Sequence, residues 1–64
     1  MSGEPLSERI MKALRDPMTV EEAARKVDVD PSIVLNVMLR LASEGKIKLV
    51  DGERWQARYQ VVKR

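Results

Sequence analysis

Residues 19–31 of this 64-residue chain read TVEEAARKVDVDP, and this stretch decides the fold. It opens with a capping box, in which the Thr19 hydroxyl accepts a hydrogen bond from the amide of Glu22 and the Glu22 carboxylate accepts one from the amide of Thr19. A helix is therefore predicted over about residues 20–27. Its inner face carries apolar and small residues at helical spacing, namely Val20, Ala23, Ala24 and Val27.

The second half of the stretch predicts a tight turn and the start of another helix. Asp28 has a short polar side chain that tolerates the left-handed conformation at a helix end. Asp30 is a favoured N-cap residue, and Pro31 suits the first position of a helix. Gly45 is expected to end this helix, which is predicted over about residues 31–44. Its apolar stripe consists of Val34, Val37, Met38 and Leu41, and Val29 is expected to anchor the turn in the core.

A first helix is predicted upstream, over about residues 5–15. Pro5 suits its first position, and Pro17 ends it because the residue before a proline is pushed out of the helical region. Met18 is then expected in a short extended segment before the capping box. The apolar residues of this helix recur at helical spacing and are Leu6, Ile10, Ala13 and Leu14.

Residues 46–62 alternate between apolar and polar side chains, which is typical of strands with one buried face. Asp51 and Gly52 form a strong turn signal between two such runs, so a β-hairpin is predicted. Trp55 is interpreted as the first core residue of the second strand, and stacking on a base is the alternative interpretation. The residues assigned to the buried face of the hairpin are Ile47, Leu49, Trp55, Ala57, Tyr59 and Val61.

The composition excludes several classes of function. The chain has no Cys and no His, which removes disulfides, thiolate metal sites and the commonest general base. It has no Gly-rich phosphate loop, so an enzyme is not predicted, and neither a metal nor a cofactor is expected. No apolar run approaches the roughly 20 residues of a membrane helix, and the opening residues MSGEP do not resemble a signal peptide. A single cytoplasmic domain over residues 1–64 is predicted, with no membrane partner.

Charge is distributed unevenly along the chain. Residues 1–44 contain six Lys or Arg and eight Asp or Glu, for a net charge of −2. Residues 45–64 contain six Lys or Arg and two Asp or Glu, for a net charge of +4. This asymmetry indicates a polyanion or an acidic partner for the C-terminal third. A solubilising strand face is the alternative interpretation.

The segments Met18–Ala24, Pro31–Val34 and Gly45–Ile47 together resemble a winged helix-turn-helix domain. Small prokaryotic transcription regulators of the ArsR and MarR type are similar. The resemblance implies an α+β fold, with three helices followed by a two-stranded β-hairpin wing in which Tyr59 is a buried strand aromatic. It also implies a small transcriptional or chromosomal regulator that binds double-stranded DNA. The third helix would enter the major groove, and the basic wing would contact the phosphate backbone.

The candidate DNA contacts lie on the third predicted helix and in the wing. Asn36 and Arg40 are placed opposite the apolar stripe and have the chemistry to read adenine and guanine edges. Ser32, near the helix start, is a candidate phosphate ligand. Ordinary solvated surface is the alternative for all three residues. The candidate backbone contacts of the wing are Lys46, Lys48, Arg54 and Arg58, and Lys63 and Arg64 are expected to add non-specific attraction or to be disordered.

Leu35 and Leu39 favour a second interpretation of the same helix. They are placed on its flank and outer side, where exposed apolar residues often mark an interface. The alternative function is therefore a winged-helix protein-interaction module or accessory subunit that uses Leu35 and Leu39. A homodimer is a further expectation, since symmetric half-sites on DNA are bound by symmetric dimers.

Overall fold

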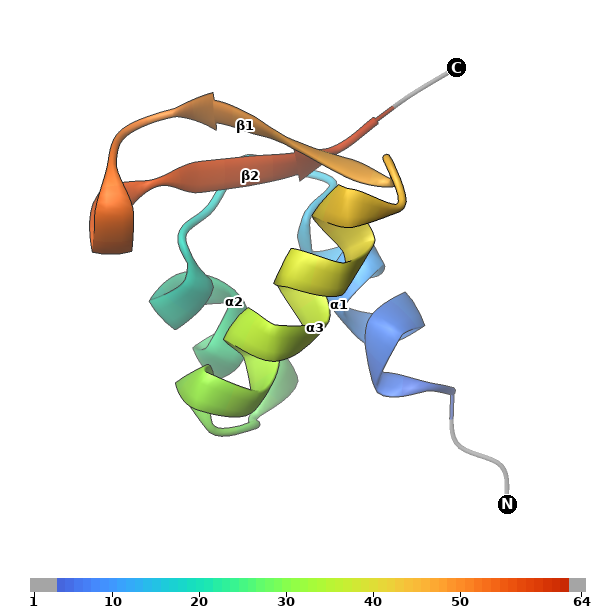
Figure 1. Cartoon of the computed structure of the whole chain (residues 1–64). Helices are drawn as coiled ribbons and strands as arrows, with labels where there is room; N and C mark the ends of the chain where they lie inside the picture. The colour runs from blue at the N-terminus through green and yellow to red at the C-terminus, as the bar shows by residue number, and fades with distance from the viewer. Residues whose placement is uncertain (1–3, 63–64) are drawn as a thin grey trace.

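The computed structural model of the chain describes residues 4–62, so Lys63 and Arg64 lie outside the described residues. Three helices, α1 (Leu6–Ala13), α2 (Val20–Val27) and α3 (Pro31–Ser43), precede the antiparallel strands β1 (Ile47–Asp51) and β2 (Arg58–Val61). One turn of 3₁₀ helix, η1 (Arg54–Gln56), lies between the strands. Figure 1 shows the hairpin lying across one side of the three helices. This α+β arrangement has the layout of a winged helix, which confirms the predicted fold class.

The ends of α2 and the start of α3 form as their residues predict. Thr19 Oγ1 accepts from the Glu22 amide at 3.2 Å, and Glu22 Oε1 accepts from the Thr19 amide at 2.9 Å. Asp28 ends α2 in the left-handed conformation, with a φ of 59°. The Asp30 carboxylate caps α3 by accepting a hydrogen bond from the Ser32 amide at 2.8 Å. These contacts all join residues close in sequence, which is why the sequence predicts them.

α1 is shorter than predicted, because it begins directly after the proline expected as its first residue and ends at Ala13. The next two carbonyl groups are used by β2 instead of by the helix. The Val61 amide donates to the Leu14 carbonyl at 3.0 Å, and the Gln60 side chain donates to the Arg15 carbonyl at 2.9 Å. Tertiary contacts with β2 therefore help to end α1 at Ala13.

β2 pairs with β1 in a two-stranded sheet and also contacts the segment before α2. It pairs with β1 in the register Ile47↔Val61 and Leu49↔Tyr59, with an irregularity before Asp51. On its other side, Tyr59 forms an isolated antiparallel bridge with Met18, and the two N···O distances are 3.2 and 2.9 Å. Met18 thus lies in an extended segment, as predicted.

The core lies where the three helices meet the start of β1. Ile10, Val34 and Met38 are buried within it, and the predicted inner face of α2 is buried throughout. Val29 packs against the core from the turn between α2 and α3. Val37, which the sequence places in the core stripe, is only half-buried because it lies beside a hollow between α3 and the start of α1.

The connection between the strands is longer than predicted, and it corrects the assignment of Trp55. Gly52 turns the chain with a φ of 84°, η1 follows, and β2 begins only at Arg58. Trp55 therefore lies outside the strand pairing and is 62% exposed, whereas Ala57 is the buried residue of this loop. The prediction that Leu49 is buried is also wrong, because the helices cover β1 only at its first residue.

Candidate nucleic-acid interface

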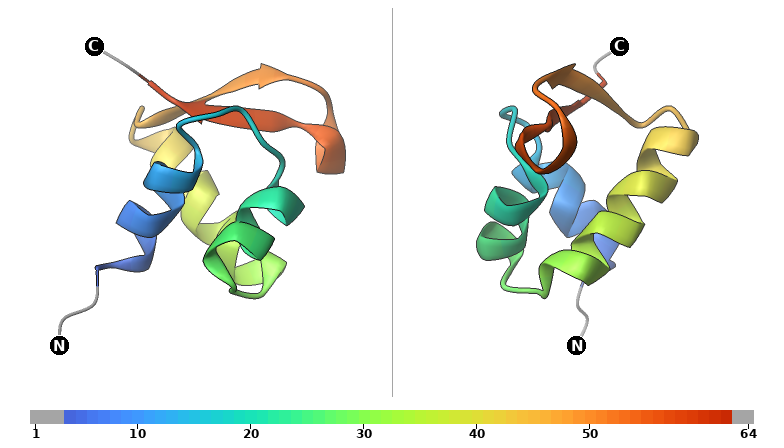
Figure 2. Two further views of the ribbon diagram at one scale, coloured as in Figure 1. Left: turned by 180° about the vertical axis from the view of Figure 1, so that it is seen from behind. Right: turned by 60° about the vertical axis from the view of Figure 1, so that its left-hand side comes forward.

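The open side of α3 carries the polar residues predicted for it. Val34, Met38 and Leu41 point inward and are buried. Asn36 and Arg40 are exposed on the other side, and their side chains make no hydrogen bond or ion pair with any residue from 4 to 62. Figure 2 shows, in its right-hand view, that the other elements leave one side of α3 uncovered. Both side chains are therefore free to contact another molecule.

The first turn of α3 is occupied by its own cap. The Ser32 amide and hydroxyl both donate to the same Asp30 carboxylate oxygen, at 2.8 and 2.6 Å. These hydrogen bonds, that of the hydroxyl foremost, lower the pKa of Asp30 below its ordinary value. Ser32 lies where the sequence predicts, but its hydroxyl is engaged by a carboxylate. Ser32 is therefore the least suited of the predicted residues to bind a phosphate.

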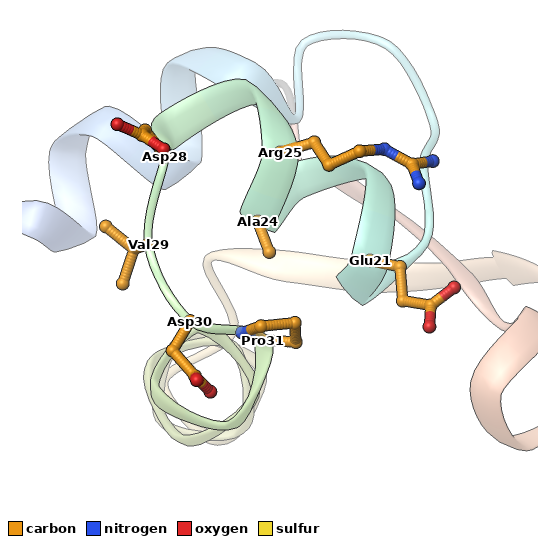
Figure 3. Close-up of a pocket in the computed structure, with 7 residues that line it drawn as sticks. All are labelled: Glu21, Ala24, Arg25, Asp28, Val29, Asp30 and Pro31. Atoms are coloured by element: carbon orange, nitrogen blue, oxygen red, sulfur yellow. The ribbon is translucent and has the colours of Figure 1, made fainter.

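A hollow lies beside the turn between α2 and α3, and most of the charged residues that line it are acidic. Glu21 and Arg25 extend from α2, and Asp28 and Asp30 lie at the two ends of the turn (Figure 3). Three carboxylates and one guanidinium thus surround this part of the surface. A phosphate backbone is disfavoured here by charge repulsion.

Arg40 lies on the second half of α3, away from that acidic turn. It lines a hollow between α3 and the start of α1, together with Leu41, Glu44 and Lys46. Within this hollow, Lys46 Nζ lies 3.4 Å from a carboxylate oxygen of Glu44. The structure thus brings Arg40 close to one predicted wing cation, Lys46, and that cation already has a partner.

The remaining wing cations differ in their partners. Arg58 forms two hydrogen bonds with the Asp51 carboxylate, from Nε at 2.8 Å and from Nη2 at 2.6 Å. Lys48 and Arg54 are exposed and have no ion-pair partner in the described part of the chain. Lys48 lies on β1, and Arg54 lies in η1 at the tip of the wing. Of the four predicted wing contacts, these two have their charge free.

The charges of the described residues divide between two segments of the chain. Residues 4–30 contain five Lys or Arg and seven Asp or Glu, for a net charge of −2. Residues 31–62, which form α3 and the wing, contain five Lys or Arg and three Asp or Glu, for a net charge of +2. Two ion pairs lie within this second segment, Lys46 with Glu44 and Arg58 with Asp51. The charged residues of the segment outside these pairs are Arg40, Lys48, Glu53 and Arg54.

The predicted apolar surface on α3 forms only in part. Leu39 is 55% exposed, as expected, but Leu35 is half-buried and packs against the core. The helical angle places Ile33, like Leu35, on the flank of the outer side, and Ile33 is 49% exposed.

No protein-family model matches this sequence, and a search of the curated proteins also gives no match. From residue 4 to residue 62, no helix is long and apolar enough to cross a membrane. The same span contains no group of three or more acidic, Cys or His side chains placed to hold a metal ion.

Proposed function

We propose that this chain binds double-stranded DNA, with α3 in the major groove and the wing on the phosphate backbone, as a small transcriptional or chromosomal regulator. The observation that carries the proposal is the free polar and basic set on α3 and the wing. Asn36 and Arg40 have no side-chain partner among residues 4–62 on the open side of α3, and the wing adds two cations that are free within the same span. An α-helix fits the major groove of B-DNA, which is about 12 Å wide.

The chemistry of each residue gives it a separate role. Arg40 suits two hydrogen bonds to guanine O6 and N7, and Asn36 suits the corresponding pair on adenine. Each such pair contributes roughly 1–3 kcal/mol of discrimination against the wrong base. Lys48 and Arg54 would neutralise phosphates, which gives affinity without sequence preference.

Two carboxylates at the N-terminal end of α3, those of its N-cap residue Asp30 and of Glu21 in α2, restrict how the helix can approach the groove. Asp30 and Glu21 repel phosphates on that side, so the helix is expected to contact DNA through its second and third turns. Asn36 and Arg40 lie in those turns. A tilted α3, with its first turn held away from the backbone, follows from this charge distribution.

The test is fluorescence anisotropy of a labelled duplex at several salt concentrations, with Arg40→Ala, Arg54→Ala and Lys26→Ala compared with the unchanged protein. Lys26 is the matched control because it loses the same charge from the hollow between α1 and α2, away from α3. Arg40→Ala is expected to weaken binding about tenfold, and Arg54→Ala to reduce the salt slope by about one. Equal effects of Arg40→Ala and Lys26→Ala would overturn the proposed surface.

A second candidate function rests on the exposure of Leu39 and Ile33 on α3. Two large apolar residues on one open helix are also suited to a protein partner or to a homodimer. Leu39→Glu separates the two functions, because it should abolish self-association or partner binding while leaving the fold intact. Light scattering measures self-association, and duplex anisotropy of the same variant measures the effect on DNA binding.

A further inference from the structure

Trp55 is exposed at the tip of the wing, and the proposed contacts of α3 do not use it. It is the single tryptophan of the chain, and at 62% it has the largest exposed fraction among the exposed large apolar residues between positions 4 and 62. An indole ring left in water forgoes the stabilisation that burial would provide. A tryptophan in this position is therefore better explained by a ligand than by folding.

The backbone around Trp55 is held in a defined turn. A Cβ atom on Gly52 would lie 2.3 Å from the Gln56 carbonyl oxygen, so the two sides of the loop are in close contact. The Gln56 amide donates to the Glu53 carbonyl at 2.9 Å, and the Ala57 amide donates to the Arg54 carbonyl at 3.1 Å. The turn thus presents Trp55 from an ordered backbone rather than from a loose loop.

Arg54 stands beside Trp55 in a conformation that is unusual for its residue type. Its φ is 54°, in the left-handed region that non-glycine residues seldom adopt. Arg54 and Trp55 line one shallow hollow at the wing tip, together with the flanking Glu53. An aromatic ring next to a guanidinium is the combination on which the bases of single strands stack, largely regardless of sequence.

We infer that the wing tip is a stacking site for an unpaired nucleobase, with Trp55 as the ring that stacks and Arg54 as the adjacent cation. The inference rests on the proposed binding of duplex DNA by α3. In an intact duplex both faces of each base are covered by its neighbours, so an indole can reach a base face only where a base is unpaired. Stacking uses the face of the ring and needs no phosphate at that position, so it is compatible with the phosphate contact proposed for Arg54. The preferred ligand is therefore duplex DNA that adjoins unpaired bases.

The single tryptophan makes the test direct, because its fluorescence reports on the wing tip alone. The protein is titrated with a duplex whose two ends are closed by non-nucleotide linkers, so that every base is paired, and with the same duplex carrying an unpaired internal stretch. Tryptophan quenching and anisotropy are recorded together. Quenching is expected only with the unpaired stretch, accompanied by about tenfold tighter binding.

Substitutions of Trp55 distinguish stacking by the indole ring from a general disturbance of the wing. Trp55→Ala is expected to remove the tenfold preference and to leave binding of the closed duplex unchanged, while Trp55→Phe retains most of the preference. Leu49→Ala is the matched control, since Leu49 is an exposed apolar wing residue outside the tip. Circular dichroism should show an unchanged fold in every variant.

The outcomes distinguish this inference from the proposed function. Equal affinity and equal quenching for both DNAs, with closed-duplex binding intact, overturn the stacking site and leave the proposed function standing. Quenching by the DNA with the unpaired stretch, without any binding of the closed duplex, supports the stacking site and overturns the major-groove proposal. A preference that survives Trp55→Ala also overturns the stacking site.

Discussion

Arg58 holds the Asp51 carboxylate with two hydrogen bonds, of 2.8 Å from Nε and 2.6 Å from Nη2, across the base of the wing loop. The two residues are register partners at the end of the hairpin, directly before and after the loop that carries η1. This bidentate pair has the geometry in which Arg binds a carboxylate most specifically. Arg58 is therefore tied into the wing, which leaves the free charge of the wing to Lys48 and Arg54.

The first prediction concerns the titration of Asp51. The Arg58 hydrogen bonds lower the pKa of Asp51 from its ordinary value of 3.8. Because the folded pKa is the lower one, the stabilisation is complete above the ordinary value and is lost as the pH falls through the folded pKa. Arg58→Gln is expected to return the pKa of Asp51 toward its ordinary value, as measured by NMR of the carboxyl carbon.

Asp30 provides an internal control for that titration. Its pKa is also lowered, but by hydrogen bonds from Ser32 at the start of α3. Arg58→Gln should leave the pKa of Asp30 unchanged. If Asp51 titrated identically with and without Arg58, the ion pair seen across the loop would not persist in solution.

The second prediction concerns the capping box of α2. Thr19→Ala removes the acceptor of the Glu22 amide and is expected to lower the free energy of unfolding by about 1 kcal/mol. For a domain of this size that corresponds to a loss of roughly 4–8 °C in melting temperature. Thr19→Ser keeps the hydroxyl and should keep most of the stability. Thermal unfolding followed by circular dichroism compares the three proteins, and equal losses in both variants would argue against the capping role.

The third prediction uses two neighbours on α3 with opposite surroundings. Met38 is 2% exposed and Leu39 is 55% exposed. Met38→Ala is expected to lower the free energy of unfolding by about 2–5 kcal/mol, because it leaves a cavity in a small core. Leu39→Ala should change it by less than about 0.5 kcal/mol. Urea denaturation measures both, and a similar cost for the two would contradict the assigned orientation of α3.

The fourth prediction compares two glycines that share a positive φ. Gly45, at 76°, has no heavy atom within 4 Å of an added Cβ, whereas an added Cβ on Gly52 would meet the Gln56 carbonyl oxygen. Gly45→Ala therefore carries only the backbone penalty of about 1–2 kcal/mol. Gly52→Ala must also displace the loop, so a larger loss of stability and a changed Trp55 emission spectrum are expected. Unfolding free energies that are equal in the two variants would be inconsistent with the packed loop.

Helix ends and helix faces could be predicted because their causes are local. Thr19 and Glu22 cap each other within one turn, and Asp28 and Asp30 act on the residues beside them. The inner face of α2 follows from a period of 3.6 residues alone. The most displaced helix end, that of α1 at Ala13, lies where β2 takes up the next two carbonyl groups.

The residues of the candidate site could be predicted from the sequence, but the hydrogen-bond and ion-pair partners of their side chains could not. Asn36 and Arg40 lie on the open side of α3 where the helical angle places them. The sequence does not reveal that Arg58 is neutralised by Asp51 or that the Ser32 hydroxyl is held by Asp30. Which cations stay free depends on side-chain partners, and those partners are set by the folded geometry.

By itself the sequence determined the order of the elements, the caps and the buried faces of the helices, because these follow from contacts within a few residues. Only the tertiary structure decided how far the core extends beneath the wing. A strand period of two residues assigns Leu49 and Trp55 to a face, but burial also requires a layer packed against that face. The helices cover β1 only at Ile47, and the wing loop lifts Trp55 out of the strand pairing. Both side chains are therefore exposed on the wing, and the indole is available for binding.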